Sequence, residues 1–409
     1  METMTRAEEI MEIEARYGAH NYHPLPVVLE KGEGVLVWDV DGKQYFDFLS
    51  AYSAVNQGHC HPRIIGALEK QAKRLTLTSR AFYNDKLGVY EKYISEYFGF
   101  DKVLPMNSGA EGVETAIKIA RRWAYDVKGI AKDQAKIVVA GENFHGRTTT
   151  IISFSTDPDS YGGFGPYTPG FVNVPYNDLE ALASALEDSN VAAFLVEPIQ
   201  GEAGVNVPSD GYLRGVRELC TKHNVLFIDD EIQTGIARTG KLLAIDHEGV
   251  RPDILILGKA ISGGVYPVSA VLADDAIMNV IKPGQHGSTF GGNPLACVVA
   301  VEALEVIRDE DLAKNAQVLG ERFREAMAEL VDELDILKGV RGKGLLNAVL
   351  INDTPESSTA WDMCMALKEN GLLAKPTHGN IIRFAPPLVM TAEQMETCIN
   401  IISDTLRKF

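Results

Sequence analysis

The chain has 409 residues, of which 45% are hydrophobic and 23% charged, and its formal net charge is −17 with a pI near 5.0. This is an ordinary globular composition, and the length fits a large domain together with a smaller one. The negative charge excludes nucleic acid and anionic membranes as partners bound through bulk electrostatics. Any phosphate or carboxylate ligand must therefore be held by local donors.

The N-terminal segment, METMTRAEEIMEIEARYGAH, is acidic and favours a helix over 5–17. It lacks the basic and apolar regions of a signal peptide, and it is too acidic for an organelle transit peptide. No apolar run is long enough to span a bilayer. The five cysteines are scattered without a C-x-x-C motif, which indicates a reducing compartment. These features predict a cytoplasmic protein.

An extended, proline-containing segment over 20–28 precedes two predicted strands, 35–39 and 44–48, joined by a turn at Asp41-Gly42. The loop that follows contains His59-Cys60-His61. Adjacent ligands in a loop before a proline do not match zinc spacing, so we predict no metal site there.

A short apolar run over 103–106 leads into Ser108-Gly109-Ala110-Glu111. The S-x-x-E spacing predicts a capping box, and the apolar residues after it recur at helical spacing. Free N–H groups and the helix dipole at such a start can bind an anion. The same residues are equally compatible with a capped helix that binds nothing.

Four apolar runs follow, separated by helical segments that include 180–186 and 213–220; the runs span 137–140, 193–196, 225–228 and 254–257. Continuous apolar strands are typical of a mainly parallel sheet with helices on both faces, which is an α/β fold. Ligands of such sheets bind beyond the carboxyl ends of the strands. Polar residues follow each of the four runs, so the sequence predicts a site at that edge.

After Pro283 a glycine-rich loop, HGSTFGGNP, carries the hydroxyls of Ser288 and Thr289. The remaining elements indicate a smaller α+β unit, with helices over 294–308, 311–333 and 391–406 and strands within 340–350 and 381–384.

The segment Gly235–Lys241 matches the phosphate-loop pattern G-x-x-x-x-G-K. Leu242 occupies the position of the Mg²⁺-binding hydroxyl, and no strand immediately precedes Gly235. We therefore reject a nucleotide phosphatase.

Lys259 follows the apolar run 254–257 and is either a snorkelling surface residue or a desolvated amine able to form a Schiff base. Asp230 follows the preceding run and is either a structural carboxylate or the counter-charge of a protonated ring nitrogen. With the helix start at 108–110, the two supply the lysine, carboxylate and anion cradle that pyridoxal 5′-phosphate requires. Phe144 can stack on its ring.

Several segments together resemble the fold-type I, class III pyridoxal-phosphate aminotransferases, which act on terminal amines; they are NSGAEGVETAIKIAR, ENFHGRT, EPIQGEAG, FIDDEIQTGIARTG, LGKAISGGVYPVSAV and HGSTFGGNP. The resemblance covers nearly the whole chain. It implies a large cofactor-binding domain over 63–313 with a mainly parallel seven-stranded sheet. It also implies a small α+β domain formed by the N-terminal segment 1–62 and residues 314–409.

For the cofactor, the resemblance implies that Lys259 binds the aldehyde and Asp230 the pyridinium nitrogen. Gln233 would lie near the ring hydroxyl and Phe144 against the ring. The phosphate would be held by Ser108, Gly109 and Ala110, and by Ser288 and Thr289, with Thr289 coming from the partner subunit of a homodimer.

Within the subgroup, the ends of the chain resemble enzymes that move the δ-amine of L-ornithine to 2-oxoglutarate, giving glutamate 5-semialdehyde and glutamate. This implies that Arg147 and Arg383 bind the two carboxylates of the diacid. Glu202 would mask Arg383 while ornithine is bound. Tyr22 and Tyr52 would line the ornithine end. Without the resemblance, surface ion pairing is the preferred explanation of Arg147, Arg383 and Glu202.

Three alternatives remain open at this point. The substrate could be N-acetylornithine or 4-aminobutyrate, although a phenol at Tyr22 suits a free α-amino acid. The protein could be an aminomutase, which needs no keto acid. A cofactor-binding module without activity would have no need for Lys259 and two carboxylate-binding arginines.

Overall fold

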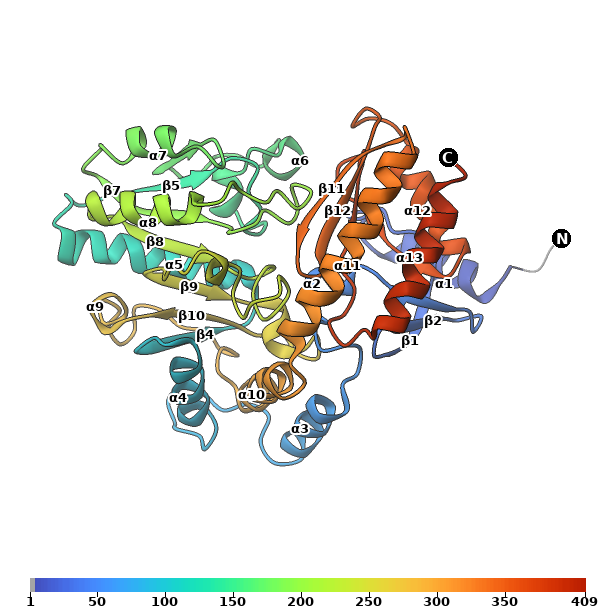
Figure 1. The fold of residues 1–409 in the computed structure, drawn as a ribbon. Helices are drawn as coiled ribbons and strands as arrows, with labels where there is room; N and C mark the ends of the chain where they lie inside the picture. Colours follow the sequence, from blue (N-terminus) through green and yellow to red (C-terminus); the bar gives the residue numbers. More distant parts are fainter. Residues whose placement is uncertain (1–3) are drawn as a thin grey trace.

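A seven-stranded sheet forms the centre of the larger part of the molecule in the computed structural model, which describes residues 4–409 (Figure 1). In spatial order its strands are β4 (Lys102–Met106), β10 (Ser269–Ala273), β9 (Ile254–Leu257), β8 (Leu226–Asp230), β7 (Val191–Val196), β5 (Lys136–Ala140) and β6 (Phe171–Val174). Only β10 runs antiparallel to its neighbours. The predicted α/β class is therefore confirmed.

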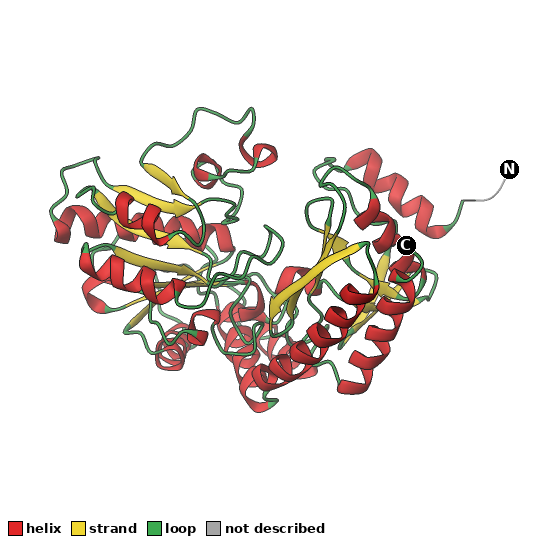
Figure 2. Cartoon of the chain, turned by 45° about the horizontal axis from the view of Figure 1, so that its top comes forward, coloured by secondary structure: helices red, strands yellow, loops and turns green. Residues whose placement is uncertain are grey.

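Helices cover both faces of this sheet, as the layers in Figure 2 show. The helix α5 (Gly109–Trp123) packs on the face that carries Ile228 and Ile256, while Phe227 and Leu257 point into the opposite core with Val216 of α8 (Tyr212–Lys222). Successive strand residues face opposite sides, which explains why the central strands are apolar throughout. Each such side chain stabilises the fold by about 1.5–3 kcal/mol on burial.

Two four-stranded sheets form the smaller part of the molecule. The first contains β1 (Leu29–Glu33), β2 (Leu36–Asp39), β3 (Gln44–Asp47) and β13 (Leu372–Leu373); the second contains β11 (Leu337–Lys343), β12 (Leu346–Ile351), β15 (Ile381–Phe384) and β14 (Lys375–Pro376). Because β13 pairs in parallel with β3, the N-terminal and C-terminal segments share one sheet. The domain boundaries at 62/63 and 313/314 stay predictions.

The remaining helices surround these sheets; the longer ones are α1 (Arg6–Tyr17), α3 (Pro62–Ala72), α4 (Leu87–Phe98), α7 (Leu179–Ala185), α10 (Pro294–Asp309), α11 (Leu312–Glu333), α12 (Thr359–Glu369) and α13 (Ala392–Leu406). Among the helices formed by residues 4–409, none is long and apolar enough to cross a bilayer.

The sequence patterns missed five strands: β1, β6 and β10, and the two-residue strands β13 and β14. β6 has only four residues, and β1 is largely exposed and polar, so neither has a clear apolar period. Asp230 is also the last residue of β8, whereas the predicted run 225–228 ended two residues before it. The carboxylate is therefore held by a sheet strand, which fixes its position more firmly than a loop.

Candidate active site

The carboxyl ends of the parallel strands and the N-terminus of α5 surround a cavity of about 180 Å³. Six of the predicted site residues line this cavity: Gly109, Ala110, Phe144, Asp230, Gln233 and Lys259. β8 and β9 are parallel neighbours, with Asp230 paired to Ile256, so Asp230 and Lys259 leave adjacent strands at the same edge. The structure thus brings together the groups that the sequence placed at separate strand ends.

Lys259 opens a short 3₁₀ turn directly after Gly258 and has a left-handed φ of 45°. Such a conformation costs roughly 1–3 kcal/mol for a residue other than glycine and persists where the surroundings fix it. Burial lowers the pKa of the Lys259 amine, while the charge of Glu202 opposes the shift. A larger neutral fraction makes this amine a better nucleophile and base.

His145 is the partner that holds the Asp230 carboxylate, and sequence reasoning did not assign it a role. The two side chains are buried, and His145 Nδ1 lies 2.6 Å from Asp230 Oδ2. Burial alone would lower the pKa of His145, but the hydrogen bond and charge of Asp230 outweigh it and raise the pKa. The contact fixes the position of the Asp230 carboxylate, which lines the cavity where a ring nitrogen would bind.

Glu197, at the end of β7, is a second residue that the sequence analysis did not single out. Its Oε2 accepts a hydrogen bond of 3.0 Å from the backbone N–H of Phe144. Burial raises the pKa of Glu197 to about 7, with Asp230 adding to the shift and His145 opposing it. The bond fixes the loop on which Phe144 forms one wall of the cavity.

The start of α5 leaves two backbone donors directed at the cavity. The predicted capping box is present, since Ser108 Oγ accepts from Glu111 N and Glu111 Oε2 accepts from Ser108 N. Within residues 4–409, the N–H groups of Gly109 and Ala110 have no hydrogen-bond acceptor. Unpaired amides at a helix start form an anion site.

These residues fit pyridoxal 5′-phosphate. The amine of Lys259 and the carboxylate of Asp230 line one cavity with the two free N–H groups and the ring of Phe144. A lysine, a carboxylate held by a cation and an anion cradle match the aldehyde, ring nitrogen and phosphate of this cofactor. Bound there, it would supply an electron sink for the carbon that loses its amine.

Glu202 and Arg383 form an ion pair beside the cavity. Arg383 Nη1 lies 2.7 Å from Glu202 Oε1, and Gln233 Nε2 donates to the same oxygen at 2.8 Å. Burial alone would raise the pKa of Glu202, but the charge of Arg383, followed by that of Lys259, lowers it to about 2. Arg383 is 2% exposed, and its Nε has no acceptor among the residues described. A donor of this buried guanidinium is therefore available to a ligand.

Of the other predicted substrate residues, Tyr52 lies beside this pair and Arg147 lies beside Phe144. Tyr52 carries its ring 5.0 Å from the Arg383 guanidinium carbon, and burial, the charge of Glu202 and the nearby Tyr22 raise its pKa. Tyr22 itself is 74% exposed. Arg147 is exposed, with its guanidinium carbon 5.7 Å from the ring centre of Phe144. The roles of these residues stay predictions, although their positions allow them.

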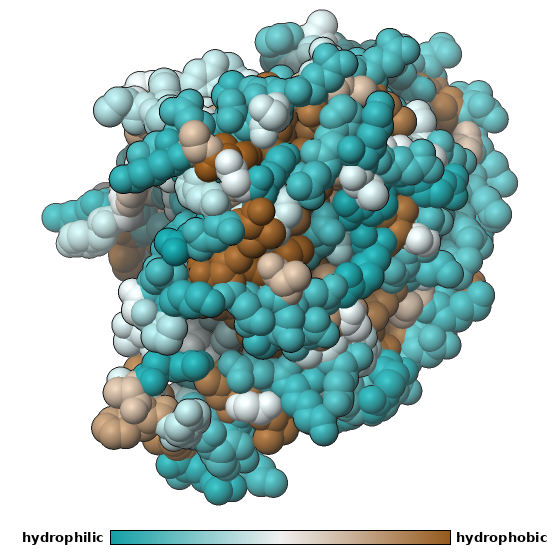
Figure 3. Space-filling model, turned by 90° about the vertical axis from the view of Figure 1, so that its left-hand side faces the viewer, coloured by the Kyte–Doolittle hydropathy of each residue, from teal (hydrophilic) through white to brown (hydrophobic). Residues whose placement is uncertain are grey.

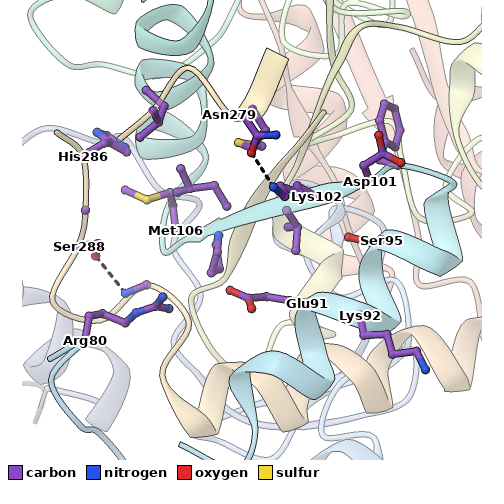
Figure 4. A pocket seen from close by; sticks show the side chains of 18 of the residues that line it. Arg80, Glu91, Lys92, Ser95, Asp101, Lys102, Met106, Asn279, His286 and Ser288 are labelled. Atoms are coloured by element: carbon purple, nitrogen blue, oxygen red, sulfur yellow. Dashed lines mark hydrogen bonds between the residues drawn. The ribbon is translucent and has the colours of Figure 1, made fainter. Parts of the chain in front are cut away.

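Ser288 and Thr289 do not reach the cavity of their own chain. Ser288 accepts a hydrogen bond of 2.8 Å from Asn107 Nδ2, and Thr289 is exposed. Their loop instead borders a wide depression of about 1140 Å³ along β4 and α4. Figure 4 shows His286 and Ser288 on one side of this depression and Lys102 with Asn279 on the other.

Neither histidine of the His59-Cys60-His61 sequence faces a metal site. His59 pairs with Asp47 at 2.8 Å and His61 with Glu310 at 2.9 Å. In the part of the chain that the structure describes, no group of three potential ligands lies together.

Asp229 and Glu231, on either side of Asp230 in sequence, are buried acids, and they make the stability of the fold depend on pH. Burial raises the pKa of both, that of Glu231 to about 8. The folded chain therefore binds more protons than the unfolded chain between about pH 4 and pH 8, and its free energy of unfolding falls as pH rises through that window. We expect Asp229→Asn to reduce this fall by about 1 kcal/mol per pH unit.

Denaturant unfolding at several pH values from 6 to 8 measures this effect. A parallel loss of stability with pH in the wild type and in Asp229→Asn would show that Asp229 is already ionised in the folded protein.

Comparisons with known proteins agree with this geometry. A family model described as aminotransferase class-III matches residues 17–406. The chain is 62% identical over 403 residues to a rat protein named "Ornithine aminotransferase, mitochondrial", covering 98% of this chain and 91% of the relative.

Two solved structures share the fold. One is titled an acetylornithine aminotransferase from Elizabethkingia anophelis, with 66% identity, a TM-score of 0.93 and coverage of 99% and 100% of the two chains. The other, an ornithine aminotransferase from Toxoplasma gondii described with PLP at its active site, has 53% identity, a TM-score of 0.96 and coverage of 98% and 94%.

The names of relatives correct the predicted location. Those from rat, Drosophila melanogaster and Caenorhabditis elegans are designated mitochondrial, so the prediction of a cytoplasmic protein is wrong. That prediction relied on the acidic character of the first residues and on scattered cysteines. Thiols stay reduced in more than one compartment, and an acidic helix at the start of a folded domain carries no information on where that domain works.

Proposed function

The chain belongs to the class-III aminotransferases, a family that uses pyridoxal 5′-phosphate, and we propose that it transfers the δ-amino group of L-ornithine to 2-oxoglutarate. The products are glutamate 5-semialdehyde and glutamate. The observation that carries the proposal is the buried Glu202–Arg383 pair beside Lys259, because it suits an enzyme that must accept two substrates of different charge.

Each half-reaction uses the same residues of the chain. The bound cofactor supplies a carbonyl and an electron-withdrawing ring. Lys259 binds the cofactor and moves a proton at the carbon that gains or loses the amine. Asp230, held by His145, keeps the ring nitrogen protonated. The cofactor would carry the amino group from one substrate to the other, so we expect ping-pong kinetics.

The Glu202–Arg383 ion pair allows one site to accept two substrates of different charge. With ornithine in the site, Glu202 stays on Arg383 and neutralises it, so the distal amine meets no unpaired cation. With 2-oxoglutarate, Glu202 leaves, and Arg383 binds the distal carboxylate through donors that include its free Nε. Arg147 binds the other carboxylate, while Tyr22 and Tyr52 hold the α-amino acid end of ornithine.

The two half-reactions can be observed separately. L-Ornithine alone should change the absorbance of the bound cofactor and release about one equivalent of semialdehyde per site, and 2-oxoglutarate should then restore the first spectrum. No spectral change with ornithine would refute the proposal. Turnover without an added keto acid would favour the aminomutase.

The main rival is a donor with a blocked α-amine, since the Elizabethkingia anophelis protein is titled an acetylornithine aminotransferase. We expect Tyr22→Ile to raise the KM for ornithine by roughly tenfold to a hundredfold, because a phenol that binds a charged amino acid head is lost. N-Acetylornithine and 4-aminobutyrate should be affected much less. A donor panel run with both proteins measures the preference, and an unchanged ornithine preference in Tyr22→Ile would revive the rival.

The active site is also proposed to be shared between two copies of the chain. Ser288 and Thr289 lie outside the cavity of their own chain, and Ser288 lines the depression along β4. Phe82, Tyr83 and Phe290 expose large aromatic surface. Hydrophobic residues also gather around a hollow on the face seen in Figure 3. Exposed apolar patches of this kind mark interaction sites. A second copy would cover them and bring its Thr289 to the phosphate.

Tyr83 provides the corresponding prediction because its side chain is fully exposed. We expect Tyr83→Glu to weaken the dimer by about a hundredfold or more, since a buried unpaired charge costs several kcal/mol. Sedimentation across a range of protein concentrations measures this. Glu96→Lys, a change of charge at an exposed helix position facing the same depression, should have a smaller effect. If Tyr83→Glu forms a dimer as tight as the wild type, Tyr83 does not lie in the interface.

A further inference from the structure

Opening of the Glu202–Arg383 pair leaves the Glu202 carboxylate without its main partner. The side chain is 27% exposed, so only part of it can be hydrated where it lies. Its remaining contact is the neutral amide of Gln233. A carboxylate whose pKa depends on a neighbouring cation loses much of its stabilisation when that cation is taken by a substrate. Lys259 also acts on Glu202 through its charge, but its amine would be engaged by the cofactor, so a further cation within reach would stabilise the displaced carboxylate.

Lys375 occupies the position from which a second cation can act. It lies on β14, directly opposite Arg383 of β15 in the antiparallel register. Directly opposed residues of an antiparallel pair project from the same face of the sheet, with Cβ atoms about 4.5–5.5 Å apart. The side chain of Lys375 is thus on the Arg383 face, which is the face that meets Glu202.

Two like charges in this arrangement normally destabilise a strand pair. Lys375 is half-buried, and within residues 4–409 it forms no ion pair and its amine has no hydrogen-bond acceptor. Burial lowers the pKa of its amine, Glu202 opposes the shift, and Arg383 adds to it. Both members of the ion pair are therefore close enough to act on Lys375, and it has no other partner to explain its position.

We propose that Lys375 receives the Glu202 carboxylate when a dicarboxylate displaces it from Arg383, and so determines specificity in the half-reaction of 2-oxoglutarate. This inference rests on the proposed function, since it supplies the second position of the gate. The exchange makes no covalent bond. The carboxylate moves from one cation to another, and the incoming distal carboxylate of the substrate takes the vacated guanidinium.

The alternative explanation of Lys375 is a snorkelling side chain whose methylene groups cover apolar surface while its amine reaches water. The two explanations differ in what a neutral side chain of similar length does. If only the methylene groups matter, Lys375→Met preserves all functions. If the charge matters, Lys375→Met weakens the binding of diacids and leaves ornithine unaffected, because Glu202 stays on Arg383 for that substrate.

Glutarate is a suitable probe because it has the five-carbon diacid skeleton but neither the keto group nor the amine that reacts. In calorimetric titration of the cofactor-loaded protein, we expect Lys375→Met and Lys375→Gln to weaken glutarate binding by roughly tenfold to a hundredfold. Lys375→Arg should restore it to within about threefold, since it keeps the cation. In steady-state assays the KM for 2-oxoglutarate should rise similarly, with the KM for ornithine changing by less than about twofold.

Lys343→Met is the matched control, because Lys343 is a half-buried lysine on β11 of the same sheet and has no role in the gate. Unchanged glutarate affinity in Lys375→Met, or an equal loss for ornithine and 2-oxoglutarate, would overturn the inference. Failure of the wild type to use ornithine is a separate result and overturns the proposed function, since glutarate binding is measured without that substrate.

Discussion

Lys259→Ala is expected to lower kcat by about 10³-fold or more, because the variant loses both the amine that holds the cofactor and the base that moves the proton. General acid–base catalysis alone contributes roughly 10²–10⁴-fold. The amine lies in the cavity with Asp230, and burial lowers its pKa toward the range of a useful base. No other lysine of residues 4–409 lines that cavity.

Borohydride reduction followed by peptide mass spectrometry tests the attachment independently of turnover. In the wild type the cofactor mass should be fixed on the peptide containing Lys259, and in Lys259→Ala it should be fixed on none. Lys259→Arg is the matched control, since it keeps a cation at the same left-handed position without a nucleophilic amine. Activity of Lys259→Ala within tenfold of the wild type would remove this residue from the mechanism.

The positions of Lys259 and Asp230 could be predicted from the sequence because each depends on local signals. A buried strand is recognisable as a continuous apolar run, and parallel strands direct their carboxyl ends to one edge. The capping box at Ser108 and Glu111 is equally local, and it is present. These local signals were enough to predict the cavity, because the parallel strand order brings the strand ends to one edge of the sheet.

His145 and Lys375 could not be assigned in the same way because their meaning depends on distant partners. His145 contacts Asp230 across 85 positions of sequence, and nothing in its own neighbourhood separates it from an ordinary core histidine. Lys375 becomes significant only through the register that sets it opposite Arg383. A shift by one residue would turn its side chain to the other face.

The backbone around Tyr52 was also unpredictable, since residues 50–53 have left-handed φ values of 46–70° and none is a glycine. Such residues cost roughly 1–2 kcal/mol each. Tertiary contacts impose the turn: Asp47 Oδ1 accepts from the N–H of Ser50 at 3.0 Å, and Ser50 Oγ donates to the carbonyl of Ala385 at 2.7 Å. The strained backbone carries Tyr52, whose ring lies against the Arg383 guanidinium.

Asp230→Asn is expected to lower kcat by about 10²–10³-fold, the usual effect of removing one preorganised charge that stabilises a transition state. An amide keeps the volume of the side chain but cannot keep the ring nitrogen protonated, so the cofactor loses most of its capacity to withdraw electrons. The raised pKa of His145 should also fall in this variant, because Asp230 is its cause.

Asp229→Asn is the matched control for this substitution. It makes the same carboxyl-to-amide replacement one residue away on the same buried strand, but on the opposite face of the sheet. Because burial raises the pKa of Asp229, this control changes the group without removing a charge. Its kcat should stay within about twofold of the wild type, while its stability changes with pH as described above. Steady-state rates measure the loss of kcat in each variant, and NMR titration measures the pKa of His145. Equal losses in both variants would mean that kcat depends on any carboxyl-to-amide replacement in β8, and Asp230 would then have no specific contact with the ring.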